Sequence, residues 1–387
     1  MNALDNYRKE IDEIDAQITR LFLRRMGVTE KVGEYKRSHG IPILDSGRER
    51  ELLSRKAGAT EDPARKADVT ALFEAILGIS RRQQRRLLSE EGHDGAYRRI
   101  RAALDHSRAP LEIPRVLYQG EPGAYADEAA VLFFGEEVPR NRVDAWEEIF
   151  LTLRDGRADY GVLPIENSST GSISQVYDLL AKYGAYIVGE QTVKVDHCLA
   201  ALPGTGLEDI REVCSHEQGL LQCAALLKEH PDWKPVARLN TAESAKFVAE
   251  SGDRSRAAIC SHRAAELYGL TILAEQINSN SRNYTRFVVV SPVVELREGS
   301  NKVSALFVLP HRSGSLHELM TVFAVNGLNL LKLESRPIVG HSWEYLFFAD
   351  FSGSLTAQGM NGVLLELSRM SEGLRILGNY PASEEPK

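Results

Sequence analysis

The chain has 387 residues, 43% of them hydrophobic and 26% charged, and at roughly 150 residues per domain this length predicts two to three domains. The composition excludes a largely disordered protein. The formal net charge of -7 argues against a protein that binds nucleic acid over most of its surface. The apolar runs are far shorter than the roughly 20 residues of a membrane helix, and the charged N-terminus lacks a signal core, so we expect a cytoplasmic protein. Its 4 cysteines have no Cys-x-x-Cys spacing, which indicates reduced thiols.

Residues 1–90 are predicted to be almost entirely helical. Apolar residues recur at steps of three and four along the first helix, which should run for about 30 residues. Asp45 stands where the N-cap of a short second helix belongs, and Asp62-Pro63 marks the start of a long third one. Such helices bury little surface alone, so we expect the chain to dimerise.

Cationic and polar residues occupy positions in this segment where apolar residues belong. Arg25 falls on the apolar stripe of the first helix, and Lys36 lies on the same face about 16 Å away at ~1.5 Å per residue. Two long side chains can bridge that gap around a small anion. Arg8 lies about 25 Å from Arg25 on the same rod, so it reaches such a ligand only from a partner subunit. The polar residues that share a face on the second and third helices are Asp45, Arg48, Glu49, Ser80 and Gln84.

Singly, each of these residues is also explained as a solvated helix surface or as part of a polar network inside a bundle. Together they place cations among carboxylate and amide partners, without an obvious nucleophile. Such a pocket suits a dianionic substrate whose reaction needs charge stabilisation and a held conformer, not proton transfer.

The segments Leu4–Asp15, Arg24-Arg25, Val32–Lys36 and Asp45–Arg50, with Ser80 and Gln84, resemble the all-helical chorismate mutase domain. The resemblance implies an intertwined dimer that rearranges chorismate to prephenate. It assigns the substrate carboxylates to Arg8, Arg25 and Arg48. It assigns the ether oxygen, where negative charge grows as the bond breaks, to Lys36 and Gln84. The hydroxyl side of the substrate and the orientation of the cations fall to Asp45 and Glu49.

Residues 91–112 are predicted to be a linker that contains a short helix. From about 113 to 293, short β-like runs alternate with helical ones, which predicts an α/β domain of two lobes with largely parallel sheets. The expected strands are Val116–Gln119, Tyr160–Pro164, Tyr186–Val195, Cys198–Leu202, Ala257–Cys260 and Phe287–Val290. The expected helices are Ala126–Phe134, Ala145–Arg154, Glu217–Glu229 and Ala242–Glu250.

Polar clusters stand at the ends of several of these elements. They are Gly120–Tyr125, Pro164–Gly171, Ser215–Gln218, Thr241–Ser244 and Asn283–Phe287. A helix cap or an Asx or ST turn explains each of them singly, but five in one domain favour a shared cleft. The sequence contains no P-loop, Ser-His-Asp pattern or group of metal-ligand spacing.

Thr285-Arg-Phe287, supported by Pro164-Ile-Glu-Asn167, resembles prephenate dehydratase. The resemblance implies a periplasmic-binding-protein-like fold of two lobes with prephenate between them. It implies that Thr285 donates a hydrogen bond or proton to the departing ring hydroxyl while CO₂ leaves and the ring aromatises. The implied substrate contacts are Glu166, Asn167, Ser168, Ser169, Ser215, His216, Thr241, Arg286 and Phe287. Glu217 and Ala126 stand where proline and serine are usual in this family, which puts local contacts in doubt.

Residues 300–381 are predicted to follow a βαββαβ order, a ferredoxin-like α+β unit. This segment resembles an ACT domain, and the resemblance implies that L-phenylalanine binds to two short segments. These are Gly314-Ser315-Leu316 and Glu334-Ser335-Arg336-Pro337. Ser315 stands where alanine is usual.

The sequence therefore predicts a bifunctional enzyme of phenylalanine biosynthesis, which turns chorismate into prephenate and then phenylpyruvate under feedback inhibition by L-phenylalanine. We expect a homodimer or higher homo-oligomer that needs no cofactor or metal and has neither nucleic acid nor membrane as a partner. One alternative is a dehydratase that prefers arogenate. Another is a non-enzymatic, amino-acid-responsive regulator, which the basic cluster at residues 81–101 supports and the cations on the first helix oppose.

Overall fold

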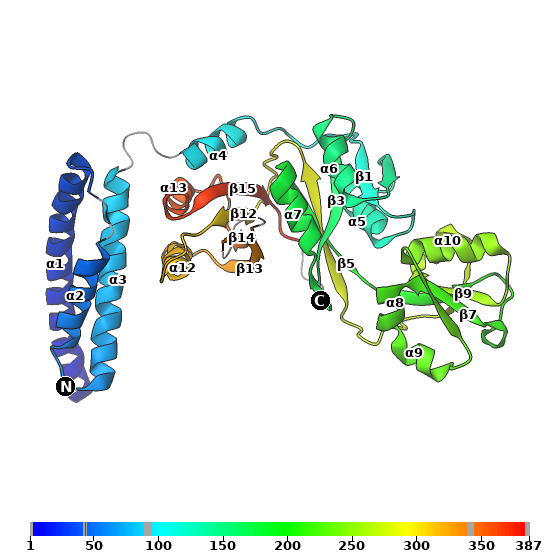
Figure 1. Ribbon diagram of the computed structural model, residues 1–387, viewed down its shortest axis with the longest axis horizontal. Coiled ribbons are helices and arrows are strands. Elements are labelled where there is room, and N and C mark those ends of the chain that lie inside the picture. Colours follow the sequence, from blue (N-terminus) through cyan, green and yellow to red (C-terminus); the bar gives the residue numbers. More distant parts are fainter. Residues whose placement is uncertain (1–2, 42, 44, 89–94, 339–343, 384–387) are drawn as a thin grey trace. The chain divides into compact units, whose positions relative to one another are not determined.

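The computed structural model describes residues 3–41, 43, 45–88, 95–338 and 344–383 (Figure 1). The chain divides into two compact units. The first comprises Met1–Arg98, Leu309–Asn326 and Asn361–Glu372, and the second comprises Arg99–Val308, Gly327–Met360 and Gly373–Lys387. In the described part of the chain, no helix has the length and apolar character to cross a membrane.

Three helices lie side by side at the start of the first unit (Figure 1). They are α1 (Ala3–Ser38), α2 (Ser46–Ala57) and α3 (Pro63–Leu88). Asp45 caps α2 as predicted, because its carboxylate accepts a hydrogen bond from the Arg48 backbone N–H at 3.0 Å. The first unit also contains α12 (Ser315–Val325) and α13 (Met360–Met370).

The apolar stripe that predicted α1 is largely exposed in the single chain. Its exposed members are Leu4, Tyr7, Ile11, Ile14, Ile18, Leu21, Val28, Val32 and Tyr35. Their exposed fractions run from 42% at Val32 to 64% at Tyr7. Such a long apolar face on a soluble helix is normally covered by another element.

The predicted linker contains the short helix expected there, α4 (Gly95–Asp105). Residues 89–94 of the linker lie outside the described part. After α4, Arg108 anchors the chain, since its guanidinium donates to Glu295 at 3.2 Å and to Ser291 at 3.1 Å.

The first lobe of the second unit is built on a sheet of order β2-β1-β3-β11-β5, with β4 beside β3. Its strands are β1 (Val116–Gln119), β2 (Arg140–Val143), β3 (Tyr160–Asn167), β4 (Gly171–Ser172), β5 (Tyr186–Lys194) and β11 (Tyr284–Ser291). One face packs on α5 (Tyr125–Phe134), and the other on α6 (Trp146–Arg154) and α7 (Ser174–Tyr183).

The second lobe is built on a sheet of order β10-β6-β9-β7-β8. Its strands are β6 (His197–Ala201), β7 (Glu212–His216), β8 (Lys234–Arg238), β9 (Arg256–Ser261) and β10 (Thr271–Ala274). The helices around it are α8 (Glu217–Gln222), α9 (Ala224–Glu229), α10 (Thr241–Ser251) and α11 (His262–Leu267). The cysteines Cys198, Cys214, Cys223 and Cys260 are free and buried in its core, as expected of reduced thiols.

The prediction of largely parallel sheets is wrong. In the first lobe β1 pairs in parallel with β2 and β3, but β11 is antiparallel to both β3 and β5. In the second lobe β7 is parallel to β8 and β9, whereas β6 is antiparallel to β9 and β10. The antiparallel strands are those that lead the chain out of one lobe and back, so they do not follow the right-handed βαβ repeat of their neighbours.

Residues 300–381 follow the predicted βαββαβ order. The strands β12 (Lys302–Val308), β13 (Leu330–Pro337), β14 (Tyr345–Ser352) and β15 (Glu372–Tyr380) form a sheet of order β13-β14-β12-β15. This is the strand order of a ferredoxin-like sheet.

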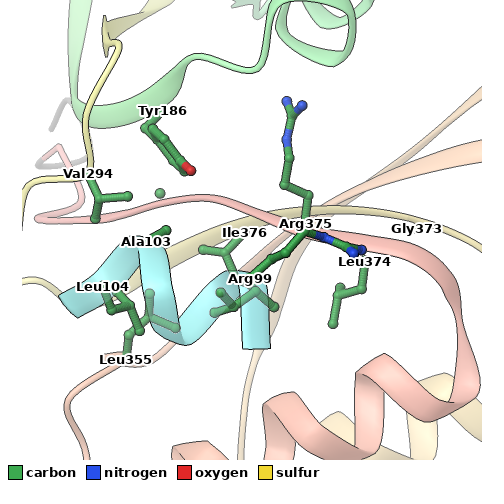
Figure 2. Close-up of a pocket in the computed structure, with 12 residues that line it drawn as sticks. Arg99, Ala103, Leu104, Tyr186, Val294, Leu355, Gly373, Leu374, Arg375 and Ile376 are labelled. Carbon is green, nitrogen blue, oxygen red and sulfur yellow. The ribbon is translucent and has the colours of Figure 1, made fainter. Parts of the chain in front are cut away.

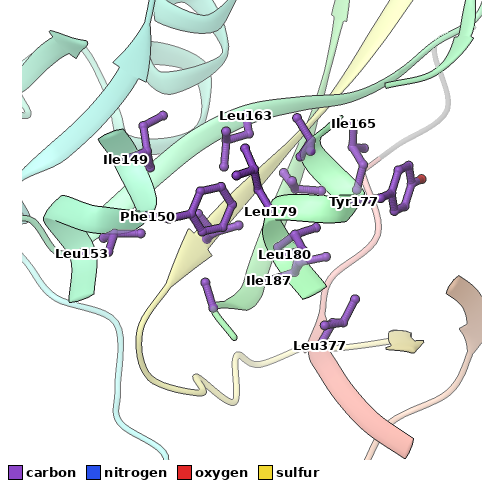
Figure 3. Packing of buried hydrophobic residues seen from close by; sticks show 14 of the residues in the cluster. Ile149, Phe150, Leu153, Leu163, Ile165, Tyr177, Leu179, Leu180, Ile187 and Leu377 are labelled. Carbon is purple, nitrogen blue, oxygen red and sulfur yellow. The ribbon is translucent and has the colours of Figure 1, made fainter. Parts of the chain in front are cut away.

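The C-terminal sheet shares a hydrophobic core with the first lobe (Figure 3). Leu306, Phe348, Leu377 and Tyr380 of the C-terminal strands belong to the same buried cluster as Phe150 and the other apolar residues of α6, α7, β3 and β5. At Gly378 the two parts approach so closely that an added Cβ would lie 1.9 Å from the carbonyl oxygen of Ile187. The first lobe and the C-terminal sheet are therefore packed as one body.

Candidate functional site

A polar cluster lies where α1 crosses α3. The Arg25 guanidinium donates to the Ser80 hydroxyl at 2.5 Å, and Gln84 is buried one turn further along α3. The Gln84 Oε1 atom has no hydrogen-bond partner among the described residues. Burial lowers the pKa of Arg25 below its usual value. A partly desolvated guanidinium is unfavourable unless an anion binds it, so Arg25 makes this cluster the best candidate anion site among the described residues of the first unit. The unpaired Gln84 atom is an acceptor and would face a donor group of a ligand.

The other polar residues predicted in this unit are arranged around α2. Lys36 donates to the Ile43 carbonyl at 2.6 Å, and Glu49 forms an ion pair with Arg81 of α3. Arg8 and Arg48 are exposed. The structure therefore brings Arg25, Ser80 and Gln84 together, but it leaves Arg8 near the far end of α1.

In the second unit, the carboxyl ends of strands from both lobes meet around Gly123. The Ser261 hydroxyl at the end of β9 donates to the Gly123 carbonyl at 2.8 Å. Gly123 has a φ of +85°, and an added Cβ would lie 2.8 Å from the Ala264 Cα atom. Only glycine combines this left-handed backbone conformation with so close an approach to Ala264. The two-glycine loop after β1 is therefore part of the contact between the lobes.

Asn167 and Thr285 form a buried pair at the edge of the first lobe. The Asn167 Oδ1 atom accepts from the backbone N–H groups of Ser169 at 2.9 Å and Thr170 at 3.1 Å, which fixes the orientation of its amide. Its Nδ2 atom then donates to the Thr285 Oγ1 atom at 2.9 Å and to the Asn283 Oδ1 atom at 2.8 Å.

The Thr285 hydroxyl is thereby used as an acceptor. No backbone or side-chain acceptor within the described chain takes its proton. Since a hydroxyl has one proton and two lone pairs, Thr285 is held as a hydrogen-bond donor aimed away from Asn167. Thr285 can therefore donate a hydrogen bond to a ligand.

Three further polar residues surround this pair. Ser168 accepts from the Tyr284 N–H at 2.9 Å, and Ser169 donates to Asn283 at 3.2 Å. Both serines are exposed, whereas Asn283 is 1% exposed. Asn283 was not among the predicted site residues, although it opens the polar cluster that contains Thr285.

In the second lobe, the three predicted substrate contacts differ in burial and in their hydrogen-bond partners. Ser215 is fully buried and its hydroxyl donates to the Ile259 carbonyl at 2.8 Å, so it joins β7 to β9 and the expected substrate contact is not supported. His216 is exposed and caps α8 by accepting from the Gln218 N–H at 3.2 Å. Thr241 is the first residue of α10. An added Cβ at Gly219 would lie 2.5 Å from Ser215 Oγ and 3.4 Å from Thr241 Cγ2, so these groups are neighbours.

Arg286, Glu166 and Phe287 are not gathered around Thr285 as predicted. Successive side chains of a strand point to opposite faces, and Arg286 follows Thr285 on β11. Its guanidinium forms ion pairs with Glu166 at 3.3 Å and Asp350 at 2.9 Å, while Phe287 is buried in the core beneath α5. The expected substrate contacts of Arg286 and Phe287 are therefore corrected to structural contacts.

A buried histidine at the crossing between the lobes was missed. The Tyr125 hydroxyl lies 3.0 Å from the Nδ1 atom of His197, and the Nε2 atom of His197 lies 3.0 Å from the Oε1 atom of Gln222. Burial lowers the pKa of His197 and raises that of Tyr125. These residues are far apart in the chain, so no local pattern indicates that they meet.

The two segments predicted to bind an effector form different hydrogen bonds. Gly314 precedes α12 with a φ of +85°, and Ser315 donates to the Pro310 carbonyl at 2.7 Å. On β13, Glu334 accepts from Ser172 at 2.8 Å. Arg336 donates to Ser174 at 2.9 Å, while Leu316, Ser335 and Pro337 are exposed.

A cavity of about 230 Å³ lies away from all these residues (Figure 2). Its walls are mainly apolar and come from α4, β15, Tyr186, Val294 and Leu355. Arg375 lines it, but donates to the carbonyls of Leu180 and Ala181. None of the predicted site residues reaches this cavity. In the described part of the chain, no group of three or more His, Cys, Asp or Glu side chains is arranged to hold a metal ion.

Comparison with known proteins gives matches over most of the chain. Residues 7–85 match the family Chorismate mutase type II, and residues 116–293 match the family Prephenate dehydratase. The bifunctional chorismate mutase/prephenate dehydratase of Escherichia coli (strain K12) is 33% identical over 395 residues, which cover 98% of this chain and 97% of that protein. The arogenate dehydratase/prephenate dehydratase 6 of Arabidopsis thaliana is 38% identical and covers 73% of each chain. The crystal structure of prephenate dehydratase in complex with L-Phe from Arthrobacter aurescens has a TM-score of 0.63 and 32% identity, and it covers 69% of this chain and 89% of that one.

Proposed function

This chain belongs to the bifunctional chorismate mutase/prephenate dehydratase family, and from this premise we propose which residues carry each reaction. The helical domain rearranges chorismate to prephenate, and the two-lobed domain converts prephenate to phenylpyruvate. The observation that carries the assignment furthest is the bond from Asn167 to Thr285, because it leaves the threonine proton available to a ligand.

In the helical domain, Arg25 binds a carboxylate of chorismate and Gln84 donates to the ether oxygen. The rearrangement is unimolecular and transfers no proton, so catalysis consists of holding the reactive conformer and stabilising the charge that grows on that oxygen. Ser80 supports this role, since its hydroxyl holds the Arg25 guanidinium. Lys36, on the same helix, is the second cation for the ether oxygen.

Around α2, Arg48 completes the binding of the substrate carboxylates. Glu49 and Asp45 hold the hydroxyl side of chorismate and orient the cations. Glu49 is paired with Arg81, so substrate binding exchanges one partner of this carboxylate for another. Asp45 holds the start of α2 in place at the same time.

The mutase site is completed by a second copy of the chain. Arg8 and Arg25 are about 25 Å apart on one rod at ~1.5 Å per residue, so the partner subunit's Arg8 supplies the remaining cation. The exposed apolar stripe of α1 supports this proposal, because pairing of two such stripes buries it. The assembly is therefore a homodimer in which each site draws on both subunits.

In the two-lobed domain, Thr285 donates to the ring hydroxyl of prephenate as it leaves. The carbon–carbon bond to the ring carboxylate breaks and releases CO₂. Its electron pair enters the ring, and the carbon–oxygen bond breaks, so the hydroxyl departs with a proton as water. A threonine hydroxyl is a weak acid, but aromatisation of the ring supplies driving force, and the Asn167 amide prevents the hydroxyl from turning away.

Substrate contacts near Thr285 come from Ser168 and Ser169, which are exposed on the loop after β3. From the second lobe, Thr241 and His216 lie at the carboxyl edge of its parallel strands and face the ligand from the other side. Glu166 lies on β3 beside Asn167 and acts through its ion pairs with Arg286 and Lys332.

L-phenylalanine inhibits the enzyme by binding to the C-terminal ACT-type domain. The ferredoxin-like strand order supports this assignment. The segments Gly314–Leu316 and Glu334–Pro337 bind the effector, as the resemblance implies. Glu334 and Arg336 contact β4 and α7 of the dehydratase domain, so a change at the effector segment reaches the catalytic lobe directly.

The test is to supply chorismate and to follow prephenate and phenylpyruvate separately, with and without L-phenylalanine. Arg25→Ala should abolish the first step and leave added prephenate convertible, whereas Thr285→Ala should do the reverse. Loss of both activities from either variant in a folded protein contradicts the two-site assignment. Arogenate is supplied in a parallel arm, because the Arabidopsis relative carries both substrates in its name. Inhibition that survives replacement of Ser335 and Arg336 contradicts the effector assignment.

A further inference from the structure

The face of β11 opposite to Thr285 carries a set of charges that are buried or half-buried. Arg286 is 14% exposed, and its Nη1 atom lies 3.0 Å from Glu190 of β5 and 2.9 Å from Asp350 of β14. Its Nη2 atom lies 3.3 Å from Glu166 of β3. Lys302 of β12 binds Glu190 at 2.9 Å, and Lys332 of β13 binds Glu166 at 2.9 Å. We call these six residues the ion cluster: Glu166, Glu190, Arg286, Lys302, Lys332 and Asp350.

The ion cluster is neutral only when the dehydratase lobe and the C-terminal sheet are together. The lobe contributes one arginine and two glutamates, a net charge of -1, and the sheet contributes two lysines and one aspartate, a net charge of +1. Either side alone would leave an uncompensated charge in a largely buried place, which is strongly unfavourable. The cluster therefore fixes how the C-terminal sheet sits against β3, β5 and β11.

Two members of the ion cluster are direct chain neighbours of the catalytic pair. Glu166 directly precedes Asn167 in the chain, and Arg286 directly follows Thr285. Across the two strands, Asn167 is opposite Thr285 and Glu166 is opposite Arg286. The pairing shifts by one residue immediately afterwards, between Arg286 and Phe287. Such a bulge re-aims the side chains beside it, so the position of Thr285 depends on what holds Arg286 on the other face.

We propose that Arg286 is a positioning residue of the dehydratase reaction, and that its ion pair with Asp350 of the C-terminal sheet keeps Thr285 and Asn167 in their productive arrangement. This inference rests on the proposed role of Thr285. The C-terminal sheet thus contributes to the chemistry of prephenate even when no effector is bound. Lys332, a member of the ion cluster, lies on β13 together with the effector segment Glu334–Pro337, so a movement of β13 would reach Thr285 through the ion cluster.

The test compares full-length Asp350→Asn, Arg286→Gln and Arg286→Lys with the unaltered protein. The matched control is Asp178→Asn, which removes another ion pair between the same two parts, from Asp178 of α7 to Arg336 of β13. Each preparation is assayed for prephenate conversion and, as an internal control, for chorismate rearrangement. Thermal unfolding is recorded to separate loss of fold from loss of rate.

Asp350→Asn and Arg286→Gln should each lower the kcat of prephenate conversion by about tenfold or more while KM changes little. Arg286→Lys should recover part of the rate, because it keeps the charge. The double variant should lose little more than either single variant, since both remove one interaction. Chorismate rearrangement and the Asp178→Asn control should stay within about twofold of the unaltered protein.

Three results overturn the proposal. A raised KM with unchanged kcat in Arg286→Gln, without any effect of Asp350→Asn, would mean that Arg286 contacts prephenate itself. Lower stability with an unchanged kcat would mean that the cluster is only structural. An equal loss of kcat in Asp178→Asn would mean that weakening any contact between the lobe and the C-terminal sheet lowers the rate. If Asp350→Asn does not fold, Lys332→Gln reaches the cluster through Glu166 and is judged by the same criteria. An unaltered protein that fails to convert prephenate would instead contradict the proposed function.

Discussion

Replacing Asn167 by aspartate gives a sharp test of how Thr285 is oriented. The change keeps the size of the side chain and the Oδ1 atom that binds the Ser169 N–H at 2.9 Å. It replaces the Nδ2 donor by a second oxygen, which then faces the Thr285 Oγ1 atom from 2.9 Å. The threonine hydroxyl must now donate to that carboxylate, so its proton is withdrawn from the substrate.

The expected cost has two parts. The Asn283 Oδ1 atom, 2.8 Å from Nδ2, loses the shorter of its two hydrogen bonds inside a buried site, keeps the Ser169 hydroxyl at 3.2 Å and now faces a carboxylate oxygen. This should lower the free energy of unfolding by about 1–3 kcal/mol. Loss of the donor to the departing hydroxyl should lower kcat about 10²–10³-fold. KM for prephenate should change little, because both amide atoms of Asn167 already form hydrogen bonds to protein groups.

The assay is phenylpyruvate formation at saturating prephenate, with chorismate rearrangement on the same preparation as the control for folded protein. A Thr285→Val background makes the test decisive. There, Asn167→Asp should cause little additional loss of rate, because the hydroxyl through which it acts is gone. If Asn167→Asp lowers kcat by the same factor in both backgrounds, or raises KM alone, Asn167 does not act through Thr285.

Four further outcomes are expected. Ser80→Ala removes the hydroxyl that holds the Arg25 guanidinium at 2.5 Å and should slow chorismate rearrangement about fivefold, as expected for about 1 kcal/mol, with prephenate conversion unchanged; equal slowing of both reactions would contradict this. Gly378→Ala places a Cβ 1.9 Å from a carbonyl oxygen of β5 and should cost about 1–3 kcal/mol of stability, seen as a lower unfolding temperature; an unchanged temperature would mean that the two strands separate freely. A hydrogen bond from Arg115 lowers the pKa of Asp159. The ionised Asp159 carboxylate therefore stabilises the fold above the ordinary pKa of about 3.9, and this stabilisation is lost as the pH falls through the lowered pKa. Unfolding midpoints of Asp159→Asn should depend less steeply on pH below about 4 than those of the unaltered protein. Ile14→Glu on the exposed stripe of α1 should lower the mass seen in sedimentation and reduce chorismate rearrangement; a dimer that persists would place the subunit contact elsewhere.

Much of the fold follows from periodicity in the sequence. The three N-terminal helices, the cap at Asp45 and the βαββαβ order of the C-terminal segment were predicted. Five strands of the two lobes were not predicted: β2, β4, β7, β8 and β10. Of these, β2, β8 and β10 are short edge strands, whereas β7 lies inside its sheet between β9 and β8. The sequences of β2 (Arg140–Val143) and β8 (Lys234–Arg238) carry charged residues and show no apolar alternation, and β10 (Thr271–Ala274) is only four residues long.

The candidate site could be predicted in part. Thr285 and Asn167 lie within hydrogen-bond distance of each other. Arg286, expected as a substrate contact from the resemblance, forms ion pairs with Glu190 and Asp350. The strand was predicted to start at Phe287, whereas β11 begins at Tyr284, and alternation along β11 places Arg286 on the face opposite to Thr285. The contact of Tyr125 with His197 could not have been predicted, because it depends on how the chain crosses between the lobes.

The core shared by the first lobe and the C-terminal sheet sets a limit on how this protein can be divided. The Prephenate dehydratase match ends at residue 293, but Leu306, Phe348, Leu377 and Tyr380 lie in the same buried cluster as that domain. A fragment cut at the boundary of the match would expose this cluster to water and would be prone to aggregate. For expression, recombination or gene fission, the smallest separable piece therefore extends through β15, and the C-terminal sheet is inherited together with the lobe it packs against.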